Sequence, residues 1–254
     1  MMNRREILTL AMGTAAALTA APASAQAPRV LRVGCTPTGA PFTYLNLKTQ
    51  QIDGLMVDII KDIAARKGLK IEVVPLAWSA LIPSLTAGQI DVISAAVSYT
   101  AKRAEIVSFS QIVNGFGEAC FVKKDDTAAA YVKREDLKGK VVGAQAGTFY
   151  YDNLLKSGLF KEVKAYDLIP DIVREVANGR IDAGFADQPV VAYNIGEGTY
   201  TGIRIVETYK PVDWAEQGII VRKDEGKLLA EINSAIDAMK AEDVFAKLRK
   251  KWKI

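Results

Sequence analysis

The sequence predicts an α/β fold whose largely parallel sheets are flanked by helices. Three observations support this prediction. Strand-like and helix-like patterns alternate along the chain, the alternation starts again after residue 138, and the phrase Gly-x-Ile-Asp occurs in both halves, in "AGQIDVISAAV" and "NGRIDAGFAD". Alternating strands and helices are typical of sheets built from βαβ units. At 254 residues the chain is long enough for two such units.

The first unit is expected to begin with a strand at residues 30–36, "VLRVGCT". The next segment, "DGLMVDIIKDIAARKGL", has apolar residues at helical spacing and Gly68 as its C-terminal cap. The residues on its apolar face are Met56, Ile59, Ile60, Ile63 and Ala64. A strand at 70–76 follows, and Ser79 is expected to cap a short helix that ends at Gly88. Residues 89–97 are predicted as a strand that is apolar on both faces, as a central parallel strand is.

The second unit repeats this order. Strands are predicted at residues 139–147, 162–167 and 180–187, and helices at 148–158 and 168–179. Both copies of the repeated phrase therefore follow a helix that ends at glycine, and Ile-Asp enters a buried strand. Ligands bind beyond the carboxyl ends of the strands in open α/β sheets. Two such edges that face each other would form a cleft.

The N-terminus has the pattern of an export signal. Arg4 and Arg5 precede a short apolar run, and "APASAQA" supplies small residues for cleavage after Ala25. Residues 1–25 are therefore predicted to be a cleaved signal peptide. A membrane anchor is disfavoured because it needs about 20 strongly apolar residues. The arginine pair resembles a twin-arginine signal, and the general secretory route stays open.

Composition excludes several kinds of chemistry. The chain has no histidine, which removes Ser-His-Asp and Cys-His nucleophile pairs and every metal site that contains histidine. Cys35 and Cys120 are too few for a structural zinc site, and we interpret them as two separate thiols. No metal or other cofactor is predicted. The net charge of +4 is modest and spread along the chain, so no nucleic-acid partner is expected.

Several motifs, in order, resemble one known family. They are "LRVGCTPTGAPFTY", "IDGLMVDIIKDIA", "WSALIPSLTAGQIDVISAAVSYTAKRAEIVSFS", "LKGKVVGAQAGT" and "GRIDAGFADQPV". This set, which extends from about residue 30 to 252, is similar to the bacterial extracellular solute-binding proteins of family 3. Those proteins are periplasmic receptors of ABC-type uptake systems for polar amino acids.

The resemblance implies the two-lobed periplasmic-binding-protein fold of type II, with two crossover strands between the lobes. Lobe 1 would comprise residues 29–116 and 216–254, and lobe 2 residues 117–215, with hinge segments near 114–121 and 210–218. The protein would be a periplasmic monomer that closes its lobes on an amino acid or a related zwitterion. Its partner would be the membrane permease of an ABC transporter.

The resemblance also implies which residues hold the charged groups of the ligand. Arg103 matches the arginine that binds the α-carboxylate, a bidentate role that suits guanidinium. Ser98 would offer its N–H to the carboxylate and its hydroxyl to the α-ammonium, Ala96 would offer its carbonyl, and Asp187 would pair with the ammonium. Without the resemblance, these residues would be interpreted as a helix-surface arginine, a turn serine and an N-cap aspartate.

Further contacts are implied on both sides of the ligand. Thr148 and Phe149 follow Gly147 at a predicted helix start, where N–H groups favour an anion. Trp78 lies where the family places an aromatic ring or a large apolar side chain against the ligand, although packing before a helix is an equally simple explanation. Weaker candidates are Tyr44, Tyr99 and Tyr150.

The chain departs from relatives that bind basic amino acids. Those relatives carry an acidic residue after the first strand and a tyrosine three residues later, whereas this chain has Thr36 and Gly39. We expect Thr36 to contact the ligand side chain. A buried cationic side chain would lack its carboxylate partner here. A polar uncharged or moderately large amino acid is therefore favoured over a basic one, and no catalysis is expected.

Two other functions were considered. Some relatives on this fold are cyclohexadienyl or arogenate dehydratases, in which a carboxylic acid in the cleft protonates a leaving hydroxyl. That function needs a second, unpaired acid near Asp187, and the candidates are Glu118, Asp152 and Asp213. The sensor lobe of a signalling protein is disfavoured because no membrane span or effector domain follows before Ile254.

Overall fold

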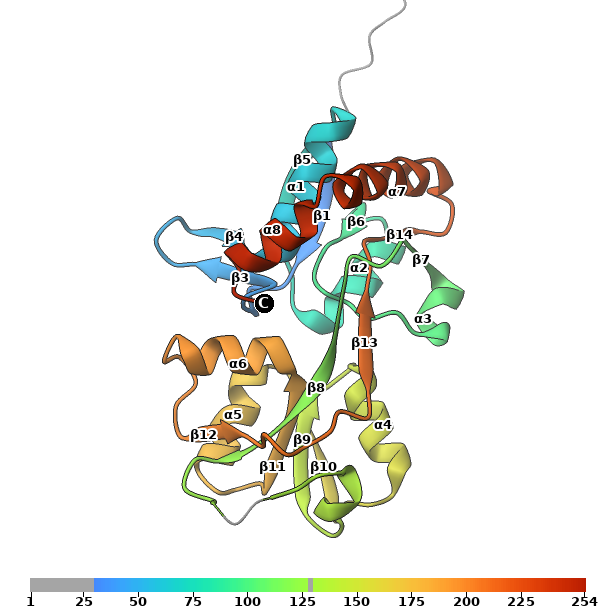
Figure 1. Cartoon of the computed structure of the whole chain (residues 1–254). Helices are drawn as coiled ribbons and strands as arrows, with labels where there is room; N and C mark the ends of the chain where they lie inside the picture. The colour runs from blue at the N-terminus through green and yellow to red at the C-terminus, as the bar shows by residue number, and fades with distance from the viewer. Residues whose placement is uncertain (1–29, 128–129) are drawn as a thin grey trace, which may run out of the picture.

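The computed structural model describes residues 30–127 and 130–254. The predicted signal peptide, residues 1–25, lies outside the described residues. The described chain forms two lobes, one above the other in Figure 1, and both ends of the described chain lie in the upper lobe. The predicted α/β fold with two lobes is confirmed.

The upper lobe contains a mixed five-stranded sheet in the order β5-β1-β6-β14-β7. Its strands are β1 (Val30–Cys35), β5 (Lys70–Pro75), β6 (Val92–Ile93), β7 (Val107–Phe109) and β14 (Ile220–Arg222). β1 pairs in parallel with β5 and β6, whereas β14 is antiparallel to β6 and β7. Its helices are α1 (Leu55–Lys67), η1 (Trp78–Ala80), α2 (Leu81–Thr86), α3 (Ala101–Ile106), α7 (Gly226–Ala241) and α8 (Val244–Lys251). A small antiparallel sheet of β2 (Thr38–Gly39), β3 (Thr43–Asn46) and β4 (Gln51–Asp53) adds to this lobe.

The lower lobe repeats this arrangement with the order β10-β9-β11-β8-β12. Its strands are β8 (Asn114–Lys123), β9 (Val141–Gln145), β10 (Glu162–Tyr166), β11 (Ala183–Asp187) and β12 (Ile203–Ile205). β9 is parallel to β10 and β11, and β8 runs antiparallel to β11 and β12. Its helices are η2 (Arg134–Leu137), α4 (Phe149–Ser157), α5 (Ile169–Ala177) and α6 (Gln188–Gly196).

Two antiparallel strands connect the lobes. The first half of β8 pairs with β13 (Trp214–Gln217), and the pair runs between the lobes in Figure 1. Phe116 lies opposite Ala215 in this ribbon. The predicted lobe boundaries, at 116/117 and 215/216, fall within this ribbon.

The apolar face predicted for the first helix is buried against the sheet. Met56, Ile59 and Ile63 have exposed fractions of 0%, Ile60 of 2% and Ala64 of 4%. Burying a side chain of this size contributes roughly 1.5–3 kcal/mol. Gly68 ends the helix in the left-handed conformation, with φ of 62°. The helix and its predicted cap are confirmed.

The repeated Gly-x-Ile-Asp phrase has the same structural role in both lobes. Gly88 and Gly179 have φ of 71° and 69°, a conformation that favours glycine. Asp91 then exchanges two bonds with Arg32, because its N–H donates to the Arg32 carbonyl at 2.8 Å and its Oδ2 accepts the Arg32 N–H at 3.0 Å. Asp182 does the same with Val141, at 2.8 Å for each bond. The phrase therefore ties each new strand to the neighbouring central strand.

Two local predictions were wrong. Ser79 does not cap a helix: it lies inside η1, whose N-cap is Ala77, because a 3₁₀ turn begins before α2. The strand predicted at 89–97 is regular only in β6. Beyond it the chain is diverted by contacts distant in sequence, since the Ser94 hydroxyl donates to the Met56 carbonyl at 2.7 Å.

The two cysteines lie in different lobes and are free, which confirms that they are separate thiols. Both are buried, and burial raises the pKa of each thiol to about 12, so neither is ionised near neutral pH. Among residues 30–127 and 130–254, no helix is both long and apolar enough to cross a bilayer.

Candidate ligand-binding site

Two adjoining cavities lie between the lobes. Both are lined by Trp78, Ala96, Gln145, Ile169 and Asp187. The first is completed by Ser98, Thr148, Phe149, Tyr150, Phe185 and Ala186. The second is completed by Thr36, Thr38, Gly39, Phe42, Thr43, Ala95 and Val190. The structure thus brings together at one cleft the predicted residues Thr36, Trp78, Ala96, Ser98, Thr148, Phe149 and Asp187.

The eighth predicted residue, Arg103, reaches across the cleft beside these cavities. Its Nη1 donates to the Ser98 carbonyl at 2.7 Å in its own lobe, and its Nη2 donates to the Gly147 carbonyl at 3.0 Å in the other. The guanidinium carbon lies 5.8 Å from the centre of the Trp78 ring, within cation–π range. These contacts engage two of its five N–H donors, so donors remain for a carboxylate.

Local sequence explains the position of Arg103. Thr100 caps α3, and its Oγ1 accepts the Arg103 backbone N–H at 3.2 Å. The side chain is partly buried, and burial lowers the pKa of the guanidinium, while the negative charges of Asp152 and Asp187 act in the opposite direction. A cation in this position gains from an anion that enters the cleft.

Asp187 ends β11 and comes directly before α6, but its side chain makes no capping bond to that helix. Burial raises the pKa of its carboxyl to about 7, although the Tyr150 hydroxyl and the Arg103 guanidinium lower it. The ionised form of this carboxyl is poorly stabilised in the ligand-free cleft. A cationic partner would stabilise it and favour loss of its proton.

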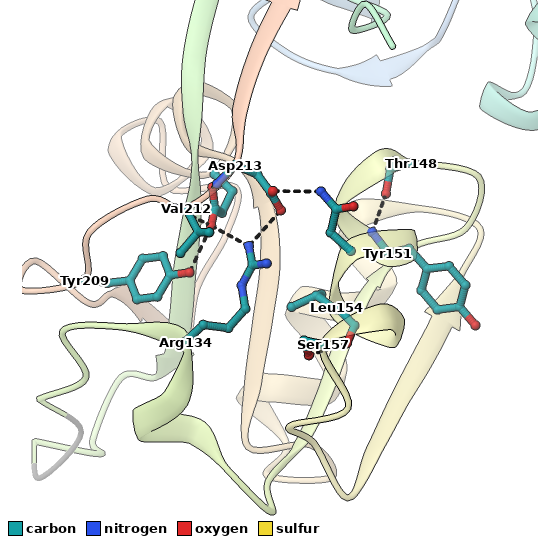
Figure 2. A network of polar contacts seen from close by, with 10 residues as sticks. Arg134, Thr148, Tyr151, Leu154, Ser157, Tyr209, Val212 and Asp213 are labelled. Atoms are coloured by element: carbon teal, nitrogen blue, oxygen red, sulfur yellow. Dashed lines mark hydrogen bonds and ion pairs between the residues drawn. The ribbon is translucent and has the colours of Figure 1, made fainter. Parts of the chain in front are cut away.

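The first turn of α4 faces the same cleft. Thr148 caps this helix, with Oγ1 accepting the Tyr151 N–H at 3.3 Å (Figure 2). The same Oγ1 donates to the Gln145 carbonyl at 2.6 Å. Gly147 precedes the cap with φ of 73°. The helix start is therefore held against the cleft, where its N–H groups and dipole favour an anion.

The lobe-1 wall is formed by an irregular segment after β6. Ala96 has φ of 54°, which is uncommon for a residue other than glycine. Ser98 is buried and forms an isolated bridge with Gln217 of the second crossover strand. The backbone N–H and carbonyl groups of this segment are therefore not paired in a regular strand ladder where the segment borders the cleft.

A buried charged network lies on lobe 2 at the base of the crossover strands (Figure 2). Glu118, which is opposite Asp187 in the β8–β11 register, accepts from Arg134 at 2.9 Å and from the Tyr209 hydroxyl at 2.9 Å. Its remaining bonds come from the N–H groups of Val212 and Asp213. Asp213 also accepts from Arg134, at 2.7 Å, and from Asn153 of α4, at 2.7 Å.

The dehydratase function would need a second, unpaired acid near Asp187, and the contacts of the three candidates can now be compared with that requirement. Glu118 and Asp213 are engaged with Arg134, and Asp152 is exposed to solvent. None of the three is an unpaired acid buried beside Asp187.

Of the three tyrosines that were weaker candidates, the structure places one at the cleft and the other two elsewhere. Tyr150 lines the first cavity. Tyr44 instead packs edge-on against Trp252, and Tyr99 is exposed and packs against Phe109.

Sequence reasoning missed several residues that line the cavities: Gln145, Ile169, Phe42, Thr43 and Val190. Thr43 forms a 2.8 Å hydrogen bond with Thr36 through their hydroxyl groups. The sequence does give a signal for Gln145, because it lies near the end of a predicted strand and ligands bind beyond the carboxyl ends of strands in such sheets.

Contacts join the lobes on the side of the cleft opposite Arg103 as well. The Asn194 amide donates to the Ala40 carbonyl at 3.1 Å, and Lys253 pairs with Glu197 at 2.7 Å. The cleft is therefore bounded by direct contacts between the two lobes.

Comparison with known proteins agrees with this arrangement. The histidine-binding periplasmic protein of Escherichia coli (strain K12) is 29% identical over 255 residues, which cover 96% of each chain. The structure of an ancestral arginine-binding protein bound to glutamine is 33% identical with a TM-score of 0.79, covering 88% of this chain and 97% of that one. An ancestral amino acid-binding protein, a precursor of cyclohexadienyl dehydratase, is 29% identical with a TM-score of 0.78, covering 88% and 95%.

The profile of one protein family matches almost the whole described chain, residues 31–253. Together with the two lobes and the cleft between them, this match shows that the chain belongs to the bacterial extracellular solute-binding proteins, family 3.

Proposed function

We propose that this protein is a periplasmic receptor that binds an amino acid with an uncharged side chain between its lobes and delivers it to the permease of an ABC transporter. One observation carries the proposal. A guanidinium on lobe 1, Arg103, and a poorly stabilised carboxylate on lobe 2, Asp187, border the same cleft. Such a pair suits a zwitterion that bridges two lobes.

The charged groups of the ligand would occupy the first cavity. Its carboxylate would accept from Arg103, from the Ser98 N–H and from the start of α4 at Thr148 and Phe149. Its ammonium would pair with Asp187, with the Ala96 carbonyl and the Ser98 hydroxyl nearby. Each of these residues other than Arg103 lines a cavity, and Arg103 bonds to Ser98 directly.

The ligand side chain would enter the second cavity. Apart from Asp187, the residues that line it are uncharged, including the Thr36–Thr43 hydroxyl pair, Phe42 and Val190. A cationic side chain would be buried here without a counter-ion, which is costly. This lining supports an uncharged ligand. Among the relatives, one is named for histidine, and an ancestral arginine-binding protein has been solved both with glutamine and with arginine.

Closure follows from the position of the two charges. A zwitterion that contacts Arg103 and Asp187 gains both interactions only when the lobes are together, so it stabilises the closed state by its differential affinity. The export signal predicted at residues 1–25 and the relatives that are named as periplasmic support action in the periplasm. The protein would act as a monomer and present its closed surface to the permease.

Thermal unfolding against the twenty standard amino acids tests the proposal, after bound ligand is removed by unfolding and refolding. A ligand at 100 times its dissociation constant adds about 2.7 kcal/mol to stability. We expect an uncharged amino acid to raise the unfolding temperature, and arginine and lysine to leave it unchanged. If only basic amino acids act, the side-chain assignment is wrong, and if none acts, the receptor function is wrong.

The dehydratase function has its own assay. One structural relative is a precursor of cyclohexadienyl dehydratase, but the candidate second acids, Glu118, Asp152 and Asp213, are ion-paired or exposed here. We expect no aromatic product from prephenate or arogenate. If product forms and its formation is lost in Asp187→Asn, the protein is an enzyme and the proposed receptor function is wrong.

A further inference from the structure

Tyr150 has a buried hydroxyl that makes no hydrogen bond to any described residue. Tyr150 is the second residue of α4. It is 3% exposed and lines the first cavity. Buried hydroxyl groups in folded proteins are nearly always bonded, because leaving one unpaired costs free energy. The Tyr150 hydroxyl therefore needs a partner within the cleft.

The surroundings of Tyr150 limit what that partner is. Burial raises the pKa of its phenol, and the negative charges of Asp187, Glu118 and Asp213 raise it further, so the group stays protonated and has a hydrogen to donate. Glu118 already accepts from Arg134, Tyr209 and two backbone N–H groups. Asp213 already accepts at both oxygens, from Arg134 and Asn153.

Asp187 is the remaining acidic acceptor of the three. Its carboxyl does not cap α6, and it lines the first cavity together with Tyr150, whose hydroxyl lowers the pKa of Asp187. The two groups are not in hydrogen-bonding geometry in the present arrangement of the cleft.

We infer that Tyr150 is a positioning residue for ligand capture: its hydroxyl donates to one oxygen of Asp187, which turns the other oxygen toward the ligand ammonium. The inference rests on the proposed amino-acid binding but concerns a residue outside the motifs that suggested it. The role inferred for the Tyr150 hydroxyl is to orient Asp187, and not to bind a charged group of the ligand.

The charges around Asp187 are consistent with this role. Arg103 faces it from α3, Tyr150 from α4, and Glu118 from the neighbouring strand β8, where Arg134 neutralises part of the negative charge. Arg103 is needed for the ligand carboxylate. Tyr150 is thus the neutral donor that is left to orient the carboxylate without competing for either ligand charge.

The test compares Tyr150→Phe with Tyr166→Phe. Tyr166 ends β10, and its hydroxyl is likewise buried without a partner, but it is not among the residues that line either cavity. The probe is the standard amino acid that raises the unfolding temperature of the wild-type protein most, and its dissociation constant is measured by calorimetry from pH 5.5 to 9. We expect Tyr150→Phe to weaken binding about tenfold at pH 8, since hydrogen bonds to charged groups are the stronger ones.

The pH profile separates positioning from packing. Loss of the hydroxyl should raise the pKa of Asp187, so the pH below which binding weakens should move up in Tyr150→Phe and stay unchanged in Tyr166→Phe. In an Asp187→Asn background, Tyr150→Phe should have little further effect. An equal loss in that background would mean that the hydroxyl contacts the ligand directly, which contradicts the inference.

A second measurement needs no ligand. The Asp187 carboxyl is titrated by carbon NMR in wild type and Tyr150→Phe, with the resonance assigned by its absence in Asp187→Asn. A higher pKa in the phenylalanine variant supports the inference, and an unchanged pKa together with unchanged affinity overturns it. If no amino acid binds the wild-type protein, the proposed function fails while this titration still tests the Tyr150–Asp187 contact.

Discussion

The two copies of the Gly-x-Ile-Asp phrase begin alike and end differently. In each lobe the aspartate bonds to the neighbouring central strand, through Arg32 in one case and Val141 in the other. After that point, lobe 1 has a two-residue strand and an irregular segment that leads to Arg103, whereas lobe 2 has a regular strand that ends at Asp187. The shared part is architecture, and the divergent ends supply opposite charges.

The two ends also differ in the regularity of their backbone. The lobe-1 segment contains Ala96 at a positive φ and a lone bridge at Ser98, so its conformation depends on contacts distant in sequence. The lobe-2 segment keeps five residues in the ladder and ends with the Asp187 carboxylate at the cleft. Irregular backbone appears where N–H and carbonyl groups themselves are expected to bind, as is common at functional sites.

The largest expected effect comes from removing the charge at the end of the lobe-1 copy. Arg103→Ala should weaken amino-acid binding by about 2–5 kcal/mol, roughly 30-fold or more, because a ligand carboxylate would be buried without its partner. Lys102→Ala is the matched control, since it removes the same charge from an exposed neighbour on α3. Calorimetry that gave equal affinities for the two variants would remove Arg103 from the site.

Removing the charge at the end of the lobe-2 copy should have the next largest effect. Asp187→Asn should weaken binding by about 1–3 kcal/mol at pH 8. In the wild-type protein, affinity should fall about tenfold per pH unit below pH 7, because the carboxyl, whose pKa is about 7, must lose its proton before it pairs with the ammonium. A binding curve without this pH dependence would place the ammonium elsewhere.

The same residue should reduce the stability of the ligand-free protein. Because the folded-state pKa of Asp187 is raised above its ordinary value of 3.8, the folded chain holds more protons than the unfolded chain between about pH 4 and 7. Its contribution to stability is therefore lost as the pH rises through this window. Urea unfolding should show Asp187→Asn to be more stable than wild type at pH 8, with the difference vanishing near pH 4. A variant less stable at pH 8 would contradict the buried, poorly solvated carboxylate.

The shared part of the two copies should affect stability but not binding. Asp91→Ala should cost about 2–3 kcal/mol, because its buried carboxylate bonds to the backbone and guanidinium of Arg32. Asp182→Ala should cost about 1 kcal/mol, because its side chain is 39% exposed and its contact with Lys140 is long. Both variants, once folded, should bind the ligand as wild type does. A loss of affinity larger than the loss of stability would mean that the phrase is not only architecture.

Local pattern predicted much of the fold because helices and strands depend on short-range periodicity and on glycine at their ends. The first helix and both glycines of the repeated phrase belong to this part. The position of Ser79 and the irregular end of β6 could not be predicted, because contacts from other segments, such as Ser94 to Met56, decide them.

The candidate site divides in the same way. The motif residues were found because their order resembles a family, and the cleft does bring seven of them to its walls. Phe42 has no local signal. The network around Glu118 joins η2, β8, α4 and the approach to β13, which only the folded chain brings together.

The central claim is that one zwitterion bridges the two divergent ends. A crystal structure of the protein with its tightest-binding amino acid tests it most directly. The account predicts that the α-carboxylate bonds to the Arg103 guanidinium on lobe 1 and the α-ammonium to the Asp187 carboxylate on lobe 2, with the side chain beside Thr36. A ligand bound in the reverse orientation, or one that contacts only one of the two residues, would contradict it.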